Sequence, residues 1–380
     1  MTVQRRTPTR VFWLTNLAPP YRRPIWSILG QRQDLVIALT GRDEAVRPWS
    51  DSTTPGEPFR IIPARGSLRA RWTAIRTMLG SDVVVLGGWH QPEYLIALVL
   101  NRGVRPIVAF YESSAASHRF PAGPVAWVRR AFFHAVDAVL AVGADSRDAV
   151  RSNGIDARRI VEGPQVVDNE FFRTATAAAR AQTPARPGHH LVYVGQLVPR
   201  KNVETALRAW AAQARPEDRF TVIGTGELRE RLAAVTVELA VTGQVSFEDH
   251  RDRQELAKLY ADAQTLVLPS LREVWGMVVN ESLAAGLHLV LSDRSGAVTA
   301  VGHMAGVFVS PPTQDGLTDA MVRSREQWDG PIEQPEILAF SPALFADRTL
   351  DALDLAQTLN TKRRQRRRRI TSRHPRDRDD

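Results

Sequence analysis

The sequence predicts an α/β protein with two domains, each built around a parallel β-sheet. Apolar runs of strand length end repeatedly at a glycine or polar turn, and an amphipathic helix pattern follows, which is typical of parallel sheets. The chain of 380 residues is longer than one hydrophobic core usually holds, so two domains are the default expectation. Because ligands of such sheets bind at the carboxyl ends of the strands, we look for functional residues in the turns that follow them.

The first domain is predicted over residues 1–173. It contains three buried strands, each an apolar run that ends in a polar or glycine turn, over residues 11–18, 82–89 and 105–114. A further strand, glycine turn and helix are predicted over residues 137–155. The domain boundary falls in residues 174–190, which are rich in Ala, Pro and small polar residues.

The second domain is predicted over residues 189–335. Three strand–turn–helix units follow one another there, over residues 191–210, 220–235 and 265–285. The last strand ends on Pro269 and Ser270, and Gly286 ends the following helix.

The C-terminal residues are predicted to form one more helix and a tail. An amphipathic pattern indicates a helix over residues 342–359, within a segment of residues 340–360. Residues 361–380 are so rich in arginine that they cannot form a hydrophobic core. We therefore expect them to be disordered.

Two glutamates, Glu273 and Glu281, lie on either side of a glycine turn at Gly276. The first backbone N–H groups of the helix that begins at Met277 have no acceptor within the helix, which suits a bound phosphate. Carboxylates accept hydrogen bonds from pairs of hydroxyls, so the two acids could hold opposite ends of one elongated ligand. The alternative is that they only complement the helix dipole. Lys201, in a basic loop after an earlier strand, is expected at the same sheet edge.

The order of these motifs resembles that of retaining glycosyltransferases of family 4. The resemblance extends over residues 10–355 and rests on VGQLVPRKN, IGTGEL, LPS-x2-E-x7-E, AAG-x3-V and GVFVSP in the second half, and on NLAPPYRRPIW and DAVLAVGADSRDAVRSNGI in the first. It implies the GT-B fold, in which two Rossmann-like domains face a central cleft. It also implies that the last helix crosses back to the first domain.

The resemblance assigns roles in the second domain, which would bind a nucleotide-sugar donor. Glu273 would contact hydroxyls of the donor sugar, Glu281 the ribose, and Lys201 the diphosphate. The implied donor-binding residues are Gly195, Gln196, Arg200, Lys201, Gly224, Gly226, Glu227, Gly276, Met277, Val278 and Glu281.

One position departs from the family pattern. The family usually has Arg directly after the glycine of the basic loop, where this chain has Gln196. Gln donates hydrogen bonds but has no charge, so the diphosphate loses one compensating cation. Arg200 is the candidate to replace it, although we expect its side chain to point elsewhere along the loop.

The first domain is expected to bind the acceptor at the turns after its strands. The candidate acceptor and cleft residues are Asn16, Tyr21, Arg22, Trp89, His90, Glu112 and Ser113. His118 is a candidate catalytic residue together with Glu273 and Lys201. A histidine that only caps a turn is the alternative for His118.

The resemblance implies transfer of a sugar from a UDP- or GDP-linked donor to a glycan, lipid-linked or metabolite acceptor, with retention of configuration and a front-face mechanism. No cofactor or metal is expected, and the sequence offers no compact Asp/His cluster of the kind metal sites use. Two alternatives stay open. One is a nucleotide-sugar epimerase of the same fold, and the other is a non-catalytic binder of nucleic acid or membranes.

The net charge of +9 is unevenly distributed. Residues 1–170 hold 22 Lys/Arg against 15 Asp/Glu, and residues 361–380 hold 10 against 3. Such a distribution suits peripheral contact with an anionic membrane, although it equally fits a basic solvated surface with no specific partner. Nucleic acid could also bind the basic residues, and of these two partners we favour the membrane. With no cysteines, no signal-peptide core and no apolar run long enough to cross a bilayer, we expect a cytoplasmic protein, in possible contact with the inner face of the plasma membrane.

Overall fold

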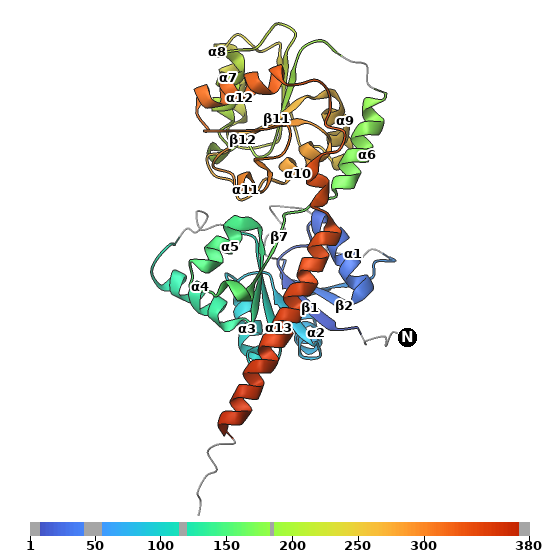
Figure 1. The fold of residues 1–380 in the computed structure, drawn as a ribbon, viewed down its shortest axis with the longest axis vertical. Helices are drawn as coiled ribbons and strands as arrows, with labels where there is room; N and C mark the ends of the chain where they lie inside the picture. The colour runs from blue at the N-terminus through green and yellow to red at the C-terminus, as the bar shows by residue number, and fades with distance from the viewer. Residues whose placement is uncertain (1–7, 42–54, 114–119, 183–185, 372–380) are drawn as a thin grey trace, which may run out of the picture. The chain divides into compact units, whose positions relative to one another are not determined.

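The computed structural model describes residues 8–41, 55–113, 120–182 and 186–371. It divides into two compact units (Figure 1): unit 1 comprises residues 1–163 and 342–380, and unit 2 comprises residues 164–341. Each unit contains one parallel sheet flanked by helices. The predicted fold class, two α/β domains with parallel sheets, is confirmed.

Unit 1 has a seven-stranded sheet with the order β3-β2-β1-β4-β5-β6-β7. Its strands are β1 Arg10–Thr15, β2 Asp34–Leu39, β3 Arg60–Pro63, β4 Val83–Leu86, β5 Ile107–Tyr111, β6 Ala138–Val142 and β7 Ile160–Gly163. Its α-helices are α1 Arg23–Arg32, α2 Leu68–Leu79, α3 Pro92–Asn101, α4 Pro124–Ala135, α5 Gly143–Arg151 and α13 Pro342–Thr371. The strand order reverses direction between β1 and β4, which makes this pair the expected ligand position of the sheet.

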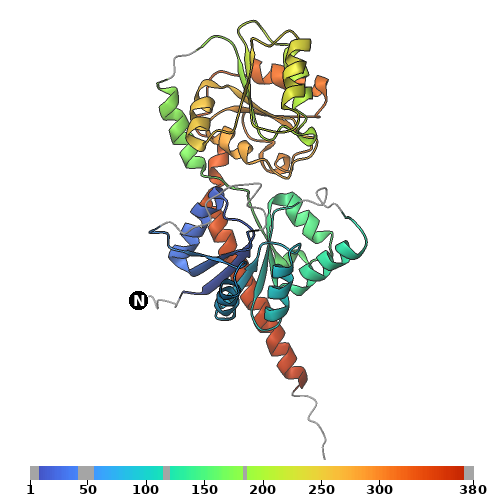
Figure 2. The same ribbon diagram turned by 180° about the vertical axis from the view of Figure 1, so that it is seen from behind.

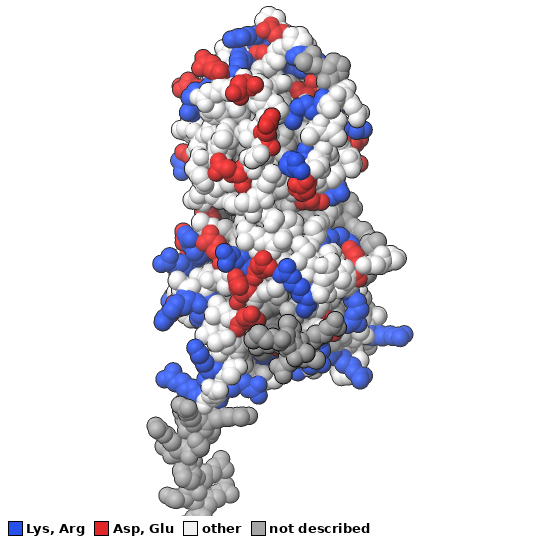
Figure 3. All heavy atoms as spheres, turned by 45° about the vertical axis from the view of Figure 1, so that its right-hand side comes forward, with Lys and Arg blue, Asp and Glu red and all other residues white. Residues whose placement is uncertain are grey.

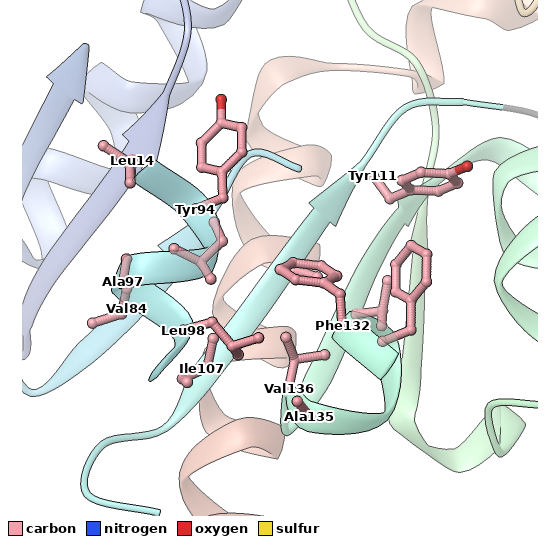
Figure 4. Close-up of a cluster of buried hydrophobic side chains, with 14 of the residues drawn as sticks. Leu14, Val84, Tyr94, Ala97, Leu98, Ile107, Tyr111, Phe132, Ala135 and Val136 are labelled. Atoms are coloured by element: carbon pink, nitrogen blue, oxygen red, sulfur yellow. The ribbon is translucent and has the colours of Figure 1, made fainter. Parts of the chain in front are cut away.

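Both faces of the unit 1 sheet are covered, as buried parallel strands require. Helix α13 lies across one face (Figure 1), and α3 and α4 cover the other (Figure 2). Side chains alternate between the faces, so Leu14 belongs to the cluster under α3 and α4, drawn in Figure 4. Its neighbour Trp13 packs on Phe110 at 5.3 Å between ring centroids, and Phe110 packs on Phe345 of α13.

Unit 2 has a six-stranded sheet with the order β10-β9-β8-β11-β12-β13. Its strands are β8 His190–Val194, β9 Arg219–Ile223, β10 Val245–Glu248, β11 Thr265–Leu268, β12 His288–Ser292 and β13 Val307–Ser310. Its α-helices are α6 Asn169–Arg180, α7 Val203–Ala211, α8 Arg229–Glu238, α9 Arg253–Asp262, α10 Met277–Ala284, α11 Val298–Val301 and α12 Gln314–Glu326. Here the order reverses between β8 and β11.

The division between the units lies earlier in the chain than the predicted boundary. Helix α6 belongs to unit 2, where it packs against α9 and α10. Its first residue, Asn169, donates through Nδ2 to the carbonyl oxygens of Ile337 and Phe340 at 2.7 and 3.0 Å. Its buried Phe172 contacts the ring of Tyr260. The helix therefore has its partners in the second unit, so residues 164–173, predicted as the end of the first domain, belong to unit 2.

The last helix is longer than predicted. Helix α13 packs against α1, β5, β6 and β7 of unit 1, and it continues past residue 360 to Thr371. In the added turns Arg363 forms an ion pair with Asp137 at 3.1 Å, and Asn360 donates to the same carboxylate at 3.4 Å. Burial raises the pKa of Asp137, whereas Arg363 and Asn360 favour its charged form. The expectation of disorder is therefore wrong for residues 361–371, and residues 372–380 lie outside the described residues.

Within the described ranges, no helix combines the length and the apolar character that crossing a membrane requires.

Candidate functional site

The predicted donor residues of unit 2 meet at the point where the strand order reverses. Strands β8 and β11 are neighbours, and the loops after them carry Lys201 and Glu273. Lys201 ends a 3-10 turn, Pro199–Lys201, and its Nζ forms an ion pair with Oε2 of Glu273. The two side chains are only 11% and 12% exposed. The structure thus brings two of the three predicted catalytic residues into direct contact.

Glu273 is held by its own loop and by the one that follows β12. Its carbonyl accepts from the Gly296 amide at 3.0 Å, and its backbone pairs with Ser295 as an isolated parallel bridge. The hydroxyl of Ser270 donates to its carboxylate at 3.4 Å. These contacts fix the carboxylate between two strand ends, where it can accept hydrogen bonds from a polyhydroxylated ligand.

The turn at Gly276 forms the N-terminus of α10. Gly276 has a φ of 85°, in the left-handed region, and a Cβ there would lie 2.7 Å from Leu268 Cδ2. The first backbone bond of the helix runs from Val279 N to Gly276 O at 3.0 Å. The amides of Met277 and Val278 therefore precede the intrahelical ladder, as the amides at an anion-binding helix start do.

Glu281 lies one turn inside α10, and its carboxylate accepts from the Tyr260 hydroxyl at 3.4 Å. Burial of the carboxyl group raises the pKa of Glu281 to about 7. Desolvation outweighs the single hydrogen bond that favours the charged form. A ligand with hydroxyl donors would supply the solvation that the carboxylate lacks.

The glycine loops after β8 and β9 support each other. The Gly195 amide donates to Ile223 O at 2.9 Å, and Leu228 N donates to Leu197 O at 3.0 Å. A Cβ on Gly224 would lie 1.9 Å from Gly195 O, so only glycine fits this approach. Gly226 and the exposed Glu227 continue the same turn.

The expectation for the side chain of Arg200 is wrong. Its Nη2 donates to Oε1 of Gln196 at 2.9 Å, so its guanidinium lies beside the residue whose missing charge it could replace. The Tyr193 hydroxyl donates to the Gln196 carbonyl at 2.9 Å and so fixes the loop that follows β8. The pair of Gln196 and Arg200 thus provides a positive charge at this loop.

Unit 1 has a cavity of about 380 Å³ at the ends of β1, β4 and β5. Six of the predicted acceptor residues line it together: Asn16, Arg22, Trp89, His90, Glu112 and Ser113. Tyr21 is next to Arg22, whose guanidinium lies 5.7 Å from the Tyr21 ring centroid. His118 lies outside the described residues.

Charged groups line this cavity. Arg22 forms an ion pair with Glu112, donates to Thr15 Oγ1 at 3.2 Å, and lies 4.7 Å from the Phe110 ring centroid. The sequence reasoning missed Arg129, which also lines the cavity. The signal for it was available, because Arg129 precedes Phe132 and Phe133 by three and four residues and so shares their inward face of α4.

Comparison with known proteins gives a family match in unit 2. Residues 178–328 match the model of the family described as "Glycosyl transferases group 1". The chain is 28% identical to glycogen synthase of Mycobacterium tuberculosis (strain ATCC 25618 / H37Rv) over 320 residues, 75% of either chain. It is 29% identical to D-inositol 3-phosphate glycosyltransferase of Nocardia farcinica (strain IFM 10152) over 196 residues, 49% of this chain and 41% of that one.

Solved structures resemble both units. Anabaena HepE in complex with UDP aligns with a TM-score of 0.66 at 16% identity, over 96% of this chain and 100% of that one. The catalytic domain of starch synthase IV from Arabidopsis thaliana, bound to ADP and acarbose, aligns with a TM-score of 0.65 at 11% identity, over 93% and 100%. These likenesses support the two-domain fold, while membership of family 4 stays a prediction.

Proposed function

We propose that this chain, a glycosyltransferase with the GT-B fold, moves a sugar from a nucleoside-diphosphate donor bound by unit 2 to an acceptor bound by unit 1, with retention of the anomeric configuration. The observation that carries the proposal is the ion pair of Lys201 and Glu273 at the strand-order reversal of unit 2. Helix α10 begins at Met277, four residues after Glu273. A cation and free amides suit a diphosphate, and a carboxylate suits sugar hydroxyls.

The reaction needs charge stabilisation at two places. Cleavage of the bond between sugar and diphosphate leaves negative charge on the phosphate oxygen and positive, oxocarbenium-like charge on the sugar. Lys201 and the amides of Met277 and Val278 would stabilise the phosphate, and Glu273 would hold the sugar hydroxyls. The acceptor hydroxyl would enter on the face that the phosphate leaves and give its proton to the departing phosphate oxygen, so no metal is required.

The remaining residues would position the donor. Glu281 is placed to accept hydrogen bonds from ribose hydroxyls, and Gln196 with Arg200 would add a donor and a charge near the diphosphate. We further propose that the acceptor is a glycan, a lipid-linked saccharide or a metabolite, held in the cavity of unit 1.

The donor is tested first. Thermal unfolding with UDP-, GDP- and ADP-sugars should raise the melting temperature for one nucleotide class, because a ligand that binds only the folded state stabilises it. Donor turnover should continue in EDTA, and NMR of the product should show the anomeric configuration of the donor. Stabilisation by none of these donors contradicts the proposal, and isomerisation of the donor without any acceptor would favour an epimerase.

We also propose that unit 1 contacts an anionic membrane through α2 and α3. Leu68 and Trp72 of α2 and Val99 of α3 are large, exposed apolar side chains. Both helices line one cavity of about 320 Å³, which is mostly apolar and whose charged residues are Arg65, Arg71 and Glu93. Apolar side chains flanked by arginines suit the boundary between lipid headgroups and acyl chains.

A further inference from the structure

Arg129 is a buried cation in the cavity of unit 1. The residue is 5% exposed, because α4 turns it toward the sheet with Phe132 and Phe133, which belong to the core drawn in Figure 4. Its Nη1 donates to the Phe120 carbonyl at 3.2 Å, and its guanidinium lies 5.6 Å from the Trp89 ring centroid. Its Nε has no hydrogen-bond partner among the described residues.

No carboxylate in the described part of the chain forms an ion pair with Arg129. Residues 114–119, which connect β5 to α4, contain no Asp or Glu. The other arginine of the cavity, Arg22, has its own partner in Glu112. Two guanidinium groups and one carboxylate therefore line the cavity, and one positive charge is left over.

A buried charge is costly unless a charge of opposite sign accompanies it. The Trp89 ring and the Phe120 carbonyl compensate a guanidinium only in part, since a cation–π contact contributes about 0.5–2 kcal/mol. A buried cation on the wall of a cavity is therefore a candidate binding residue. The missing counter-charge points to an anionic ligand.

We infer that the acceptor substrate carries a phosphate or carboxylate group, and that Arg129 binds this group in the cavity of unit 1. A planar guanidinium donates two parallel hydrogen bonds to either group. The cavity of about 380 Å³ is in the size range of small-molecule sites. Polar side chains at its wall, among them Asn16 and Ser113, are suited to the neutral hydroxyls of the same substrate. The inference rests on the proposed function, in which unit 1 binds the acceptor.

The first test uses inorganic phosphate as the probe. Phosphate should raise the melting temperature of the wild-type protein above that in chloride of equal ionic strength, and Arg129→Gln should remove most of this shift. Arg129→Gln should itself melt no lower than wild type, because it removes an uncompensated buried charge. The control is Arg130→Gln, since Arg130 is the next residue of α4 but is exposed. An equal phosphate shift in wild type and Arg129→Gln overturns the inference.

The second test compares matched acceptors: glucose, glucose 6-phosphate and glucuronate. An anionic member should give a kcat/KM at least tenfold above that of glucose, and Arg129→Gln should abolish this preference by raising KM, while Arg129→Lys keeps part of it. Equal use of neutral and anionic acceptors contradicts the inference. Donor affinity, measured by nucleotide titration without acceptor, should be unchanged in Arg129→Gln, because unit 2 binds the donor in the proposed function. If the wild-type protein binds no nucleotide sugar, the proposed function is refuted and not this inference. If Arg129→Gln loses donor affinity while the wild type keeps it, Arg129 binds the donor phosphate and the inference is overturned.

Discussion

Lys201 and Glu273 form an ion pair, and both side chains are nearly buried. Their pairing has two consequences at the scale of single residues. It holds the two catalytic candidates in one place before any ligand arrives, and it links stability to activity. Glu281 is also partly buried, and no cation in the described part of the chain forms an ion pair with it. Both arrangements can be tested by variants that separate stability from catalysis.

Removing one member of the pair should cost more stability than removing both. Lys201→Met or Glu273→Gln alone leaves a buried partner unsatisfied, which costs about 3–5 kcal/mol in comparable buried pairs. We expect the double variant to unfold in urea within about 1 kcal/mol of wild type, and all three variants to lose donor turnover. Additive stability losses in the double variant would show that the two charges do not compensate each other.

Glu281 should make the protein less stable as the pH rises. Its pKa is raised from 4.5 to about 7 by burial. The folded state therefore holds the proton more tightly than the unfolded chain, and the free energy of unfolding falls between these two pH values. Glu281→Gln should remove this fall and gain about 3 kcal/mol at pH 8, at about 1.4 kcal/mol per pKa unit. Urea unfolding from pH 4 to pH 8 measures the free energy of unfolding of both proteins. If it changes with pH equally in wild type and Glu281→Gln, Glu281 is not the group responsible.

At the scale of elements, the proposed donor site is built from loops that only glycine can close. The turns after β8 and β9 approach so closely that Gly224 has the Gly195 carbonyl where a Cβ would be. Gly224 also has a φ of 138°, a backbone conformation that other residues rarely adopt. The loop that carries Gln196 and Arg200 is thus positioned by the neighbouring strand end.

Gly224→Ala should displace the loop after β8 and weaken donor binding. The clash is with backbone, which has no rotamer to relieve it, so we expect a loss of more than 2 kcal/mol of stability and a clear loss of nucleotide affinity. Gly243→Ala is the matched control, because a Cβ at Gly243 meets nothing within 4 Å. Urea unfolding and nucleotide titration measure both, and similar behaviour of the two variants would refute the role of Gly224.

The sequence predicted best those elements whose signals are local. The strand ends with Gly224 and Gly276 were predictable, because a strand pattern, a glycine and a helix pattern follow within a few residues. The domain boundary was predicted too late in the chain, inside α6, because the partner α9 of this helix lies far along the chain. The added turns of α13 were missed for the same reason, because Arg363 pairs with Asp137, which lies far away in the sequence. Arg129 was missed, although it shares the helix face of Phe132 and Phe133, because a basic residue by itself indicates solvent.

At the scale of the whole molecule, unit 1 combines a charged surface with exposed apolar side chains. On the face drawn in Figure 3, Lys and Arg side chains are spread over unit 1 and interspersed with Asp and Glu. On α2, Leu68, Trp72 and Leu79 are spaced by four and seven residues, so these exposed side chains form one stripe. Arg69 and Arg76 lie beside it, because Arg69 follows Leu68 directly and Arg76 stands four residues after Trp72 and three before Leu79. A stripe of this kind is typical of helices that lie in a membrane interface.

Vesicle binding should therefore depend on both the apolar stripe and the arginines. We expect the protein to sediment with vesicles that contain phosphatidylglycerol but not with pure phosphatidylcholine, and to be released as salt increases. Trp72→Ser combined with Val99→Ser should weaken binding at least tenfold at every salt concentration, because the loss is of buried apolar area. Arg69→Gln combined with Arg76→Gln should weaken binding mainly at low salt, at about 1 kcal/mol for each arginine.

The control for the apolar variants is Val237→Ser on α8 of unit 2. Val237 is 68% exposed and Val99 is 76% exposed, so the two valines differ in location and not in accessibility. If α2 and α3 are the contact, Val237→Ser binds vesicles as wild type does. Equal weakening by Val237→Ser and the unit 1 variants would mean that any exposed apolar side chain contributes. Vesicle binding that survives the loss of Trp72 and Val99 but disappears without residues 372–380 would move the contact from α2 and α3 to the C-terminal residues.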